Sequence, residues 1–206
     1  MHVKIKICGI TRFEDARIAA SLGVDALGFI FSPGSPRYIE PSAVREIIRH
    51  LPPFCSKVGV FVDTPVAAII DIARLSGIDT VQLHGAEVPE ACAKIPFPVI
   101  KAFSVHPEID INSFERYNVS GYLLDTWDQK SKGGTGKTFD WSIAERAARK
   151  YKSLILAGGL GPTNIKEALD QVVPYGIDVN SGVEIKPGVK NPQKMHDVIE
   201  LVKHWH

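Results

Sequence analysis

The sequence is poor in cysteine, in long apolar runs and in excess charge of either sign. Its three cysteines, Cys8, Cys55 and Cys92, are odd in number and include no Cys-x-x-Cys pair, which excludes a disulfide scaffold and a zinc cluster. Lys and Arg total 24 and Asp and Glu total 23, so the net charge of +1 excludes a strongly basic nucleic-acid-binding surface. No apolar run approaches the roughly 18 residues of a membrane helix, and the first nine residues lack the apolar core of a signal peptide. We therefore expect a soluble, cytoplasmic protein with no nucleic-acid or membrane partner.

Short β-branched apolar runs alternate with stretches of helical period along the whole chain. The strand-like runs begin near Val3, Ala26, Lys57, Thr80, Val99, Gly121, Ser153 and Ile177. The helical patterns cover residues 13–22, 42–51, 66–75, 88–95, 111–117, 141–151, 164–172 and 192–204. Eight such units in 206 residues predict an α/β fold, a (βα)8 TIM barrel that forms one domain over residues 1–206. A doubly wound open sheet is the alternative architecture.

Three of the predicted helix starts carry capping signals. Thr11, with Glu14 three residues later, resembles a capping box. Thr64 and Asn191 each precede a proline that suits the first position of a helix. We therefore expect the side chains of Thr11, Thr64 and Asn191 to cap helices.

The loops after the predicted strands carry the candidate chemistry, because active sites of (βα)8 barrels lie at the carboxyl ends of the strands. Cys8 follows the first strand, Arg37 lies after the second, and Asp125 ends the sixth. His84 follows the fourth strand. Ordinary turn chemistry explains the glycines of these loops, but it explains Cys8, Arg37 and Asp125 less well.

Two glycine-bearing turns follow the seventh and eighth strands, and they predict a phosphate site. The first is Gly158-Gly159-Leu160 and the second is Ser181-Gly182. Glycine lets backbone N–H groups approach an anion, and this pair of loops is the usual phosphate site of the fold. Simple tight turns are the alternative interpretation.

Cys8 is a candidate base or nucleophile. It precedes a predicted helix start and lies close in sequence to Arg12, and a helix N-terminus and a cation both lower the pKa of a thiol. Asp125 follows a Tyr-Leu-Leu run, and a carboxyl group beside apolar neighbours can stay protonated near neutral pH. The alternatives are an inert buried cysteine, an ordinary loop aspartate and, for His84, a hydrogen-bonded structural histidine.

Residues 126–138 form a glycine-rich stretch after the sixth strand. Its end, Gly136-Lys137-Thr138, resembles a Walker phosphate loop, but Ser131 stands where that motif requires its first glycine. We interpret the stretch as a flap that closes over a substrate, with a solvated surface loop as the alternative. The histidines show no spacing that is typical of a metal site.

Eight short motifs occur in an order that is specific to one family. They are Lys6-Ile7-Cys8-Gly9-Ile10-Thr11, Ser35-Pro36-Arg37, Val60-Phe61-Val62, Val81-Gln82-Leu83-His84-Gly85, Leu124-Asp125, Gly133-Gly134-Thr135-Gly136 before Phe139-Asp140-Trp141, Leu156-Ala157-Gly158-Gly159-Leu160, and Asp178-Val179-Asn180-Ser181-Gly182-Val183-Glu184. The set resembles the phosphoribosylanthranilate isomerases of tryptophan biosynthesis over essentially the whole chain. The sequence departs from the common pattern at Asn180, where many members carry serine, and at Asn191, where aspartate is frequent.

The resemblance implies an isomerase that catalyses an Amadori rearrangement of N-(5-phosphoribosyl)anthranilate to 1-(2-carboxyphenylamino)-1-deoxyribulose 5-phosphate. It implies Asp125 as the general acid and Cys8 as the general base, with no cofactor and no metal. Arg37 offers a planar fork for the anthranilate carboxylate. The implied substrate contacts are Arg37, His84, Gly134, Gly136 and Asp178, and the implied phosphate contacts are Gly158, Gly159, Leu160, Ser181 and Gly182. The only partner expected is this small-molecule substrate, and the chain is expected to be a monomer or a homodimer.

Other phosphosugar barrels and a non-catalytic sugar-phosphate binding module are the alternative functions. A ribulose-phosphate epimerase needs a cluster of His and Asp ligands at the strand ends, which this sequence lacks. An indole-glycerol-phosphate synthase needs catalytic lysines at strand ends. Lys101 is available for that role, but Cys8 and Asp125 then have none. A binding module would keep the glycine loops and tolerate the loss of Cys8 or Asp125.

Overall fold

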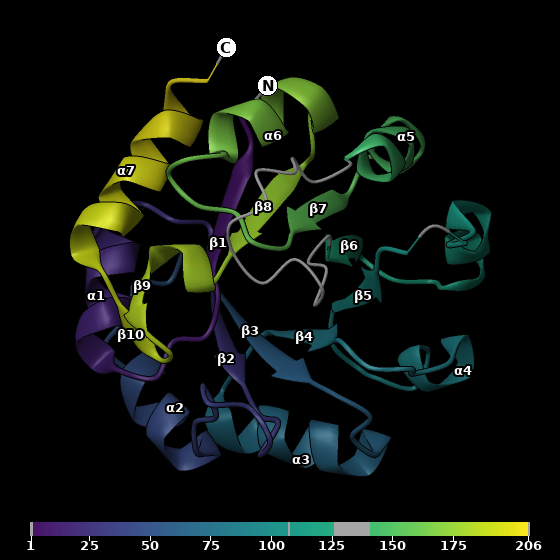
Figure 1. The fold of residues 1–206 in the computed structure, drawn as a ribbon. Coiled ribbons are helices and arrows are strands. Elements are labelled where there is room, and N and C mark those ends of the chain that lie inside the picture. Colours follow the sequence, from purple (N-terminus) through teal and green to yellow (C-terminus); the bar gives the residue numbers. More distant parts are fainter. Residues whose placement is uncertain (1, 107, 126–140, 206) are drawn as a thin grey trace.

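Eight parallel strands close into a barrel in the order β1 to β8, with helices around it (Figure 1). This computed structural model describes residues 2–106, 108–125 and 141–205. The strands are β1 (Lys4–Ile7), β2 (Ala26–Ile30), β3 (Ser56–Phe61), β4 (Thr80–Leu83), β5 (Val99–Ser104), β6 (Gly121–Asp125), β7 (Leu154–Ala157) and β8 (Gly176–Val179). Because β1 pairs in parallel with both β2 and β8, the sheet has no edge. The predicted (βα)8 barrel is confirmed, and the doubly wound alternative is wrong.

The helices lie close to the predicted stretches, with two exceptions. They are α1 (Phe13–Ser21), α2 (Pro41–Ile48), α3 (Val66–Ser76), α4 (Pro89–Cys92), α5 (Ser142–Lys150), α6 (Ile165–Val172) and α7 (Pro192–Lys203). The helix expected over 88–95 is reduced to the four residues of α4. The stretch expected over 111–117 is the 3-10 helix η1 (Ile111–Arg116), whose side-chain cap is Asp110. Both segments are far shorter than a helix that is stable by itself, so their packing against the barrel determines the form they take.

Of the three predicted caps, only Asn191 is confirmed. Its side chain accepts a hydrogen bond from the backbone N–H of Lys194, at 3.1 Å. The Thr11 hydroxyl instead donates to the Gly188 carbonyl, because α1 begins one residue later than the capping box requires. The Thr64 hydroxyl donates to the Val62 carbonyl, and Pro65 occupies the cap position of α3. The predictions for Thr11 and Thr64 are therefore wrong.

The interior of the barrel has an apolar side and a polar side. The apolar side comes from β5, β6 and β7, and it consists of Ala102, Leu123 and Ala157 with Ile100 and Ile155 packed against them. The polar side comes from β1, β4 and β8, which contribute Lys6, Gln82 and Asp178, all nearly fully buried. The Lys6 ammonium lies 2.9 Å from Gln82 Oε1 and 2.7 Å from Asp178 Oδ2. These hydrogen bonds satisfy the buried charge.

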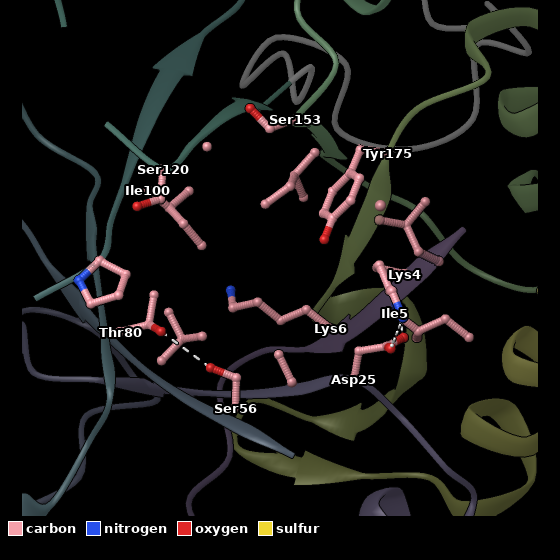
Figure 2. Close-up of a pocket in the computed structure, with 17 residues that line it drawn as sticks. Lys4, Ile5, Lys6, Asp25, Ser56, Thr80, Ile100, Ser120, Ser153 and Tyr175 are labelled. Carbon is pink, nitrogen blue, oxygen red and sulfur yellow. Dashed lines mark hydrogen bonds and ion pairs between the residues drawn. The ribbon is translucent and has the colours of Figure 1, made fainter. Parts of the chain in front are cut away.

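A cavity of about 310 Å³ opens at the amino ends of the strands (Figure 2). Ile100 and Lys6 belong to its wall, and the Lys6 side chain points toward the middle of the ring of lining residues. Gln82 and Asp178 line a second cavity at the carboxyl ends of the strands. The Lys6 ammonium and its two partners therefore lie between the two cavities.

A small insertion that was not predicted lies between β8 and α7. It consists of the 3-10 helix η2 (Ser181–Val183) and an antiparallel hairpin of β9 (Glu184–Lys186) and β10 (Val189–Lys190). The hairpin places Glu184 and Lys190 at the carboxyl end of the barrel, where Lys190 is completely buried. Among the residues that the structure describes, no helix is both long enough and apolar enough to cross a bilayer.

Candidate active site

A cavity of about 290 Å³ lies at the carboxyl ends of the strands, where active sites of this fold are found. The predicted site residues that line it are Cys8, Arg37, His84, Asp125, Gly158, Gly159, Leu160, Asp178 and Ser181. Residues from distant parts of the sequence therefore meet at one site because the barrel closes. Gly134 and Gly136, with the whole stretch 126–138 interpreted as a flap, lie outside the described residues.

The two glycine loops contact each other. Gly158 and Gly159 have φ angles of 98° and 62°, which glycine adopts without the steric cost that other residues incur. A Cβ on Gly182 would lie 1.9 Å from the Leu160 carbonyl oxygen, so this position also requires glycine. Gly182 is not among the residues that line the cavity, and its observed role is this close packing. The Asn164 side chain holds the first loop through the Gly161 N–H and the Gly159 carbonyl.

Cys8 lies at the end of β1 and is only 5% exposed. Burial is the largest influence on its thiol, and together with the nearby Asp178 carboxylate it raises the pKa of Cys8 above the usual value. Lys6 and Lys190 oppose this shift and lower the pKa, Lys6 also through a hydrogen bond. The thiolate is therefore a minor form of Cys8 near neutral pH.

The expectation that the start of α1 and Arg12 lower the pKa of Cys8 is wrong. Arg12 is exposed and is not among the groups that shift the pKa of this thiol. The lysines that act on Cys8 are Lys6 of β1 and Lys190 of the β9–β10 hairpin. The sequence did not predict that hairpin. Because the thiol is buried, its desolvation outweighs both positive charges.

Arg37 lies in the loop between β2 and α2 and forms a paired contact with Glu184. Its Nε and Nη2 atoms lie 2.9 Å and 2.7 Å from the two carboxylate oxygens of Glu184. Glu184 also accepts hydrogen bonds from the Lys190 ammonium and the Gly188 N–H. Burial raises the pKa of Glu184, but the hydrogen bonds from Arg37 and Lys190 outweigh it and keep the pKa below the usual value. This ion-pair network positions the guanidinium at the rim of the cavity.

Asp125 and His84 lie beside each other on the opposite side of the cavity. The His84 Nε2 atom is 3.4 Å from Asp125 Oδ2, and both side chains are a little over a quarter exposed. The other ring nitrogen, Nδ1, is 2.9 Å from Gln82 Nε2. The Gln82 Oε1 atom in turn accepts from Lys6. A continuous row of side chains thus runs from Asp125 to the buried lysine of β1.

Asp178 has one satisfied and one unsatisfied carboxylate oxygen. Oδ2 accepts from Lys6, while Oδ1 is buried without a hydrogen-bond partner in the part of the chain that the structure describes. A buried acceptor of this kind costs free energy unless a partner is supplied. Because Asp178 lines the cavity beside Cys8, a ligand hydroxyl is a suitable partner.

A family model described as N-(5'-phosphoribosyl)anthranilate (PRA) isomerase matches residues 5–201 of this chain. The chain belongs to the PRA isomerase family. It is 48% identical over 201 residues to the N-(5'-phosphoribosyl)anthranilate isomerase of Pelobacter propionicus, and the match covers 98% of this chain and 96% of the relative. The resemblance seen in the eight sequence motifs is therefore confirmed.

Two solved PRA isomerase structures agree with this assignment. The enzyme from Thermotoga maritima is 43% identical, with 98% of both chains covered and a TM-score of 0.89. A PRA isomerase in complex with reduced 1-(o-carboxyphenylamino)-1-deoxyribulose 5-phosphate is 41% identical, with 98% of both chains covered and a TM-score of 0.86. The fold of the PRA isomerase family is thus shared along nearly the whole chain.

The requirements of the other phosphosugar barrels are not met at this PRA isomerase cavity. Within residues 2–106, 108–125 and 141–205, no group of three His, Cys, Asp or Glu side chains is arranged to hold a metal ion. Lys101, the lysine available for a synthase, does not line the cavity. Its ammonium is buried against Glu87, at 2.9 Å, and the Gly85 carbonyl.

Four residues of the site were missed by sequence analysis: Lys6, Gln82, Glu184 and Lys190. Lys6, Gln82 and Glu184 belong to motifs of the PRA isomerase resemblance, but no role was assigned to them. The signal for Lys6 and Gln82 was a polar side chain within a strand, at a position that alternation directs into the barrel. Glu184 and Lys190 carried no such signal, because the hairpin that holds them was not predicted.

Proposed function

We propose that this chain catalyses the Amadori rearrangement of N-(5-phosphoribosyl)anthranilate to 1-(2-carboxyphenylamino)-1-deoxyribulose 5-phosphate, a step of tryptophan biosynthesis. One observation carries the proposal. A single cavity is lined by a carboxyl group, a thiol, a guanidinium and two glycine loops, which are the groups that this rearrangement needs. Membership of the PRA isomerase family supports the same reaction.

Asp125 is proposed as the general acid that opens the sugar ring. Its proton passes to the furanose ring oxygen, and the bond between that oxygen and C1 breaks. The lone pair of the anthranilate nitrogen forms the new C1–N double bond, which leaves a protonated imine. Asp125 ends β6 at the cavity, and its carboxyl group is partly exposed there, so a ligand can reach it.

Cys8 is proposed as the base of the second step. Its thiolate takes the proton from C2, the C–H electron pair forms a C1–C2 double bond, and the imine electrons return to nitrogen. The resulting enolamine becomes the aminoketose when C1 gains a proton and the C2 hydroxyl loses one. Lys6 and Lys190 lie near enough to Cys8 to stabilise the thiolate electrostatically.

The two ends of the substrate are proposed to bind on either side of the reacting carbons. The backbone N–H groups of the Gly158–Leu160 and Ser181 loops suit the phosphate. Strands β7 and β8 lie between β6 and β1 in the barrel, so a phosphate at β7 and β8 leaves the sugar between Asp125 and Cys8. Arg37 suits the anthranilate carboxylate, because within the described residues its Nη1 amine has no hydrogen-bond partner.

The activity is tested by a steady-state assay with freshly generated phosphoribosylanthranilate, in which formation of the aminoketose is followed. We expect turnover without any added metal or cofactor. A protein that binds the product analogue but does not turn over the substrate would instead be a sugar-phosphate binding module.

Arg37→Ala is expected to raise KM more than it lowers kcat, because its proposed partner is a carboxylate remote from the reacting carbons. Loss of one charged hydrogen-bonding partner costs about 1.5–3 kcal/mol, or roughly ten- to a hundredfold in kcat/KM. The matched control is Arg37→Lys, which keeps the charge but loses the planar fork, and is expected to recover only part of the loss. If the alanine variant still discriminates against a decarboxylated substrate analogue as the parent does, Arg37 does not bind the carboxylate.

We further propose that the chain forms a homodimer through the amino-terminal face of its barrel. One solved relative is described as monomers generated from a dimeric phosphoribosylanthranilate isomerase of Thermotoga maritima, and it is 39% identical to this chain. Phe54 is 99% exposed and lies in the loop before β3, two residues from Ser56 in the wall of the cavity shown in Figure 2. Because a two-fold dimer contacts itself with identical surfaces, both copies would place their Phe54 loop and their amino-terminal cavity in the proposed interface.

Phe54→Ser is expected to shift the chain from dimer to monomer, since it removes a large apolar side chain that would be buried in the interface. Sedimentation velocity over a range of protein concentrations measures this shift. Val88→Ser is the matched control, because Val88 is also exposed but lies after β4, at the opposite face of the barrel. A parent protein that is monomeric at all concentrations, or a Phe54→Ser variant that dimerises like the parent, would overturn the proposal.

A further inference from the structure

The amide of Gln82 can have only one orientation. An ammonium group only donates hydrogen bonds, so the Gln82 atom 2.9 Å from Lys6 must be the carbonyl oxygen Oε1. The buried lysine also donates to Asp178, at 2.7 Å. Because Lys6 is held by these two partners and is only 4% exposed, it does not turn away to let the amide flip. The Gln82 Nε2 group therefore points toward His84.

This orientation decides which nitrogen of His84 carries the proton. Gln82 Nε2 is a donor and lies 2.9 Å from His84 Nδ1, so Nδ1 must be the acceptor. In the neutral ring the proton is then on Nε2, the nitrogen that lies 3.4 Å from Asp125 Oδ2. An imidazolium would place an N–H at Nδ1 against the N–H of the amide, and this arrangement would lose the hydrogen bond.

We propose that Lys6 and Gln82 are positioning residues that hold His84 as a neutral donor to Asp125, so that the transferable proton of the acid lies on Oδ1. The inference rests on the proposed role of Asp125 as the general acid. Oδ2 is the carboxylate oxygen that lies 3.4 Å from His84 Nε2, so we assign it as the acceptor of the Nε2–H group when Asp125 acts as the acid. The proton that reaches the sugar ring oxygen then leaves from the other oxygen. His84 thereby determines which oxygen of Asp125 carries the proton, in addition to its predicted contact with the substrate.

A neutral donor suits a general acid better than a charged one. A positive imidazolium would favour the ionised carboxylate before the substrate arrives, and an ionised Asp125 has no proton to give. A neutral N–H group exerts a weaker pull on the protonated acid. Its hydrogen bond strengthens once the carboxylate forms, because bonds to ionised acceptors are about twice as strong as neutral ones. The contact thus favours the state that follows proton transfer.

The tautomer of His84 is measurable without any assay of activity. In a ¹⁵N-labelled parent protein at about pH 8, where an ordinary histidine is neutral, two-bond ¹H–¹⁵N spectra distinguish a protonated ring nitrogen from an unprotonated one. The signals of His84 are identified by their loss in His84→Asn. We expect a protonated Nε2 and an unprotonated Nδ1. A proton on Nδ1, or on both nitrogens, would overturn the inference.

Two substitutions of Gln82 separate positioning from a merely structural role. Gln82→Glu keeps the size of the side chain and its contact with Lys6. Its carboxylate only accepts hydrogen bonds, so it requires a proton on Nδ1 of His84. Gln82→Met keeps the volume and removes both hydrogen bonds. If Gln82 only fills space and satisfies Lys6, the glutamate variant is the milder one. If it sets the tautomer, Gln82→Glu is the more damaging.

We expect Gln82→Glu to lower kcat by about ten- to a hundredfold, with KM changed far less, because misplaced catalytic groups cost rates of this size. Gln82→Met should lower kcat less than Gln82→Glu does. Spectra of Gln82→Glu should show a proton on Nδ1 of His84. Far-UV circular dichroism and the unfolding midpoint of each variant establish that it is folded. A glutamate variant as active as the parent, or more active than the methionine variant, would overturn the positioning role.

The spectra also separate this inference from the proposed function. If Asp125→Asn keeps full activity, the assignment of the acid fails, while a protonated Nε2 in the parent still establishes the arrangement of Lys6, Gln82 and His84. If the spectra show the other tautomer, the arrangement fails, while a strong loss of activity in Asp125→Asn still supports the acid.

Discussion

Asp125→Asn is expected to lower kcat by about 10²–10⁴-fold, the range that general acid catalysis contributes. The amide keeps the shape of the side chain at the end of β6 but has no acidic proton to give to the ring oxygen. KM should change much less, because the phosphate and carboxylate contacts are made by other residues. The loss therefore falls on the chemical step.

Single-turnover rates are the appropriate measurement for this variant. If product release limits the steady state of the parent, it hides part of a loss in the chemical step. An Asp125→Asn variant that keeps more than half of the parent single-turnover rate would remove Asp125 from the role of acid.

Cys8→Ala is expected to be nearly inactive, with a loss of about 10²–10⁴-fold in kcat, because no base then takes the proton from C2. Binding of a product analogue should persist, since the phosphate loops and Arg37 are unchanged. Isothermal titration with the analogue and single-turnover kinetics measure the two properties on the same preparation. Retained turnover would show that another group is the base, and lost binding would show that Cys8 instead shapes the cavity.

The pH dependence of the parent follows from the burial of Cys8. Because burial and Asp178 raise the pKa of the thiol, the thiolate fraction is small at neutral pH and grows as the pH rises. Since the activity also requires a protonated Asp125, the thiolate itself is the quantity to follow. We therefore expect the difference in ultraviolet thiolate absorbance between the parent and Cys8→Ala to grow as the pH rises past the range of an ordinary thiol. A difference that is already complete at neutral pH would contradict the raised pKa.

Alkylation distinguishes Cys8 from the other two cysteines. All three are buried, and burial raises the pKa of each, to about 11 in Cys55. Neither Cys55 nor Cys92 lines the candidate active site. Inactivation by iodoacetamide should therefore accelerate with pH, follow modification of Cys8 in peptide maps, and slow in the presence of a product analogue.

Much of the candidate site was predicted from the sequence because the residues concerned lie at strand ends. The alternation of apolar runs and helical periods placed Cys8, Arg37 and Asp125 after different strands. Closure of the barrel then brings such positions to one face, whatever their separation in the chain. Nine of the predicted site residues accordingly line one cavity. Their roles in binding and proton transfer stay predictions.

The protonation of the site was not predictable in the same way. Proximity in sequence suggested that Arg12 acts on Cys8, whereas the cations near the thiol are Lys6 and Lys190. The first lies inside the barrel and the second in a hairpin without a clear sequence pattern. The pKa of a group depends on its burial and on the charges around it in space, and neither follows from local sequence.

The sequence by itself determined the (βα)8 architecture, the family and the face of the barrel that carries the site, because periodicity and strand-end motifs are local properties of the chain. The tertiary structure alone decided three further features: the buried thiol with its raised pKa, the pairing of Arg37 with Glu184, and the row of side chains from Lys6 to Asp125. Each depends on side chains that meet only when distant strands close around a common interior.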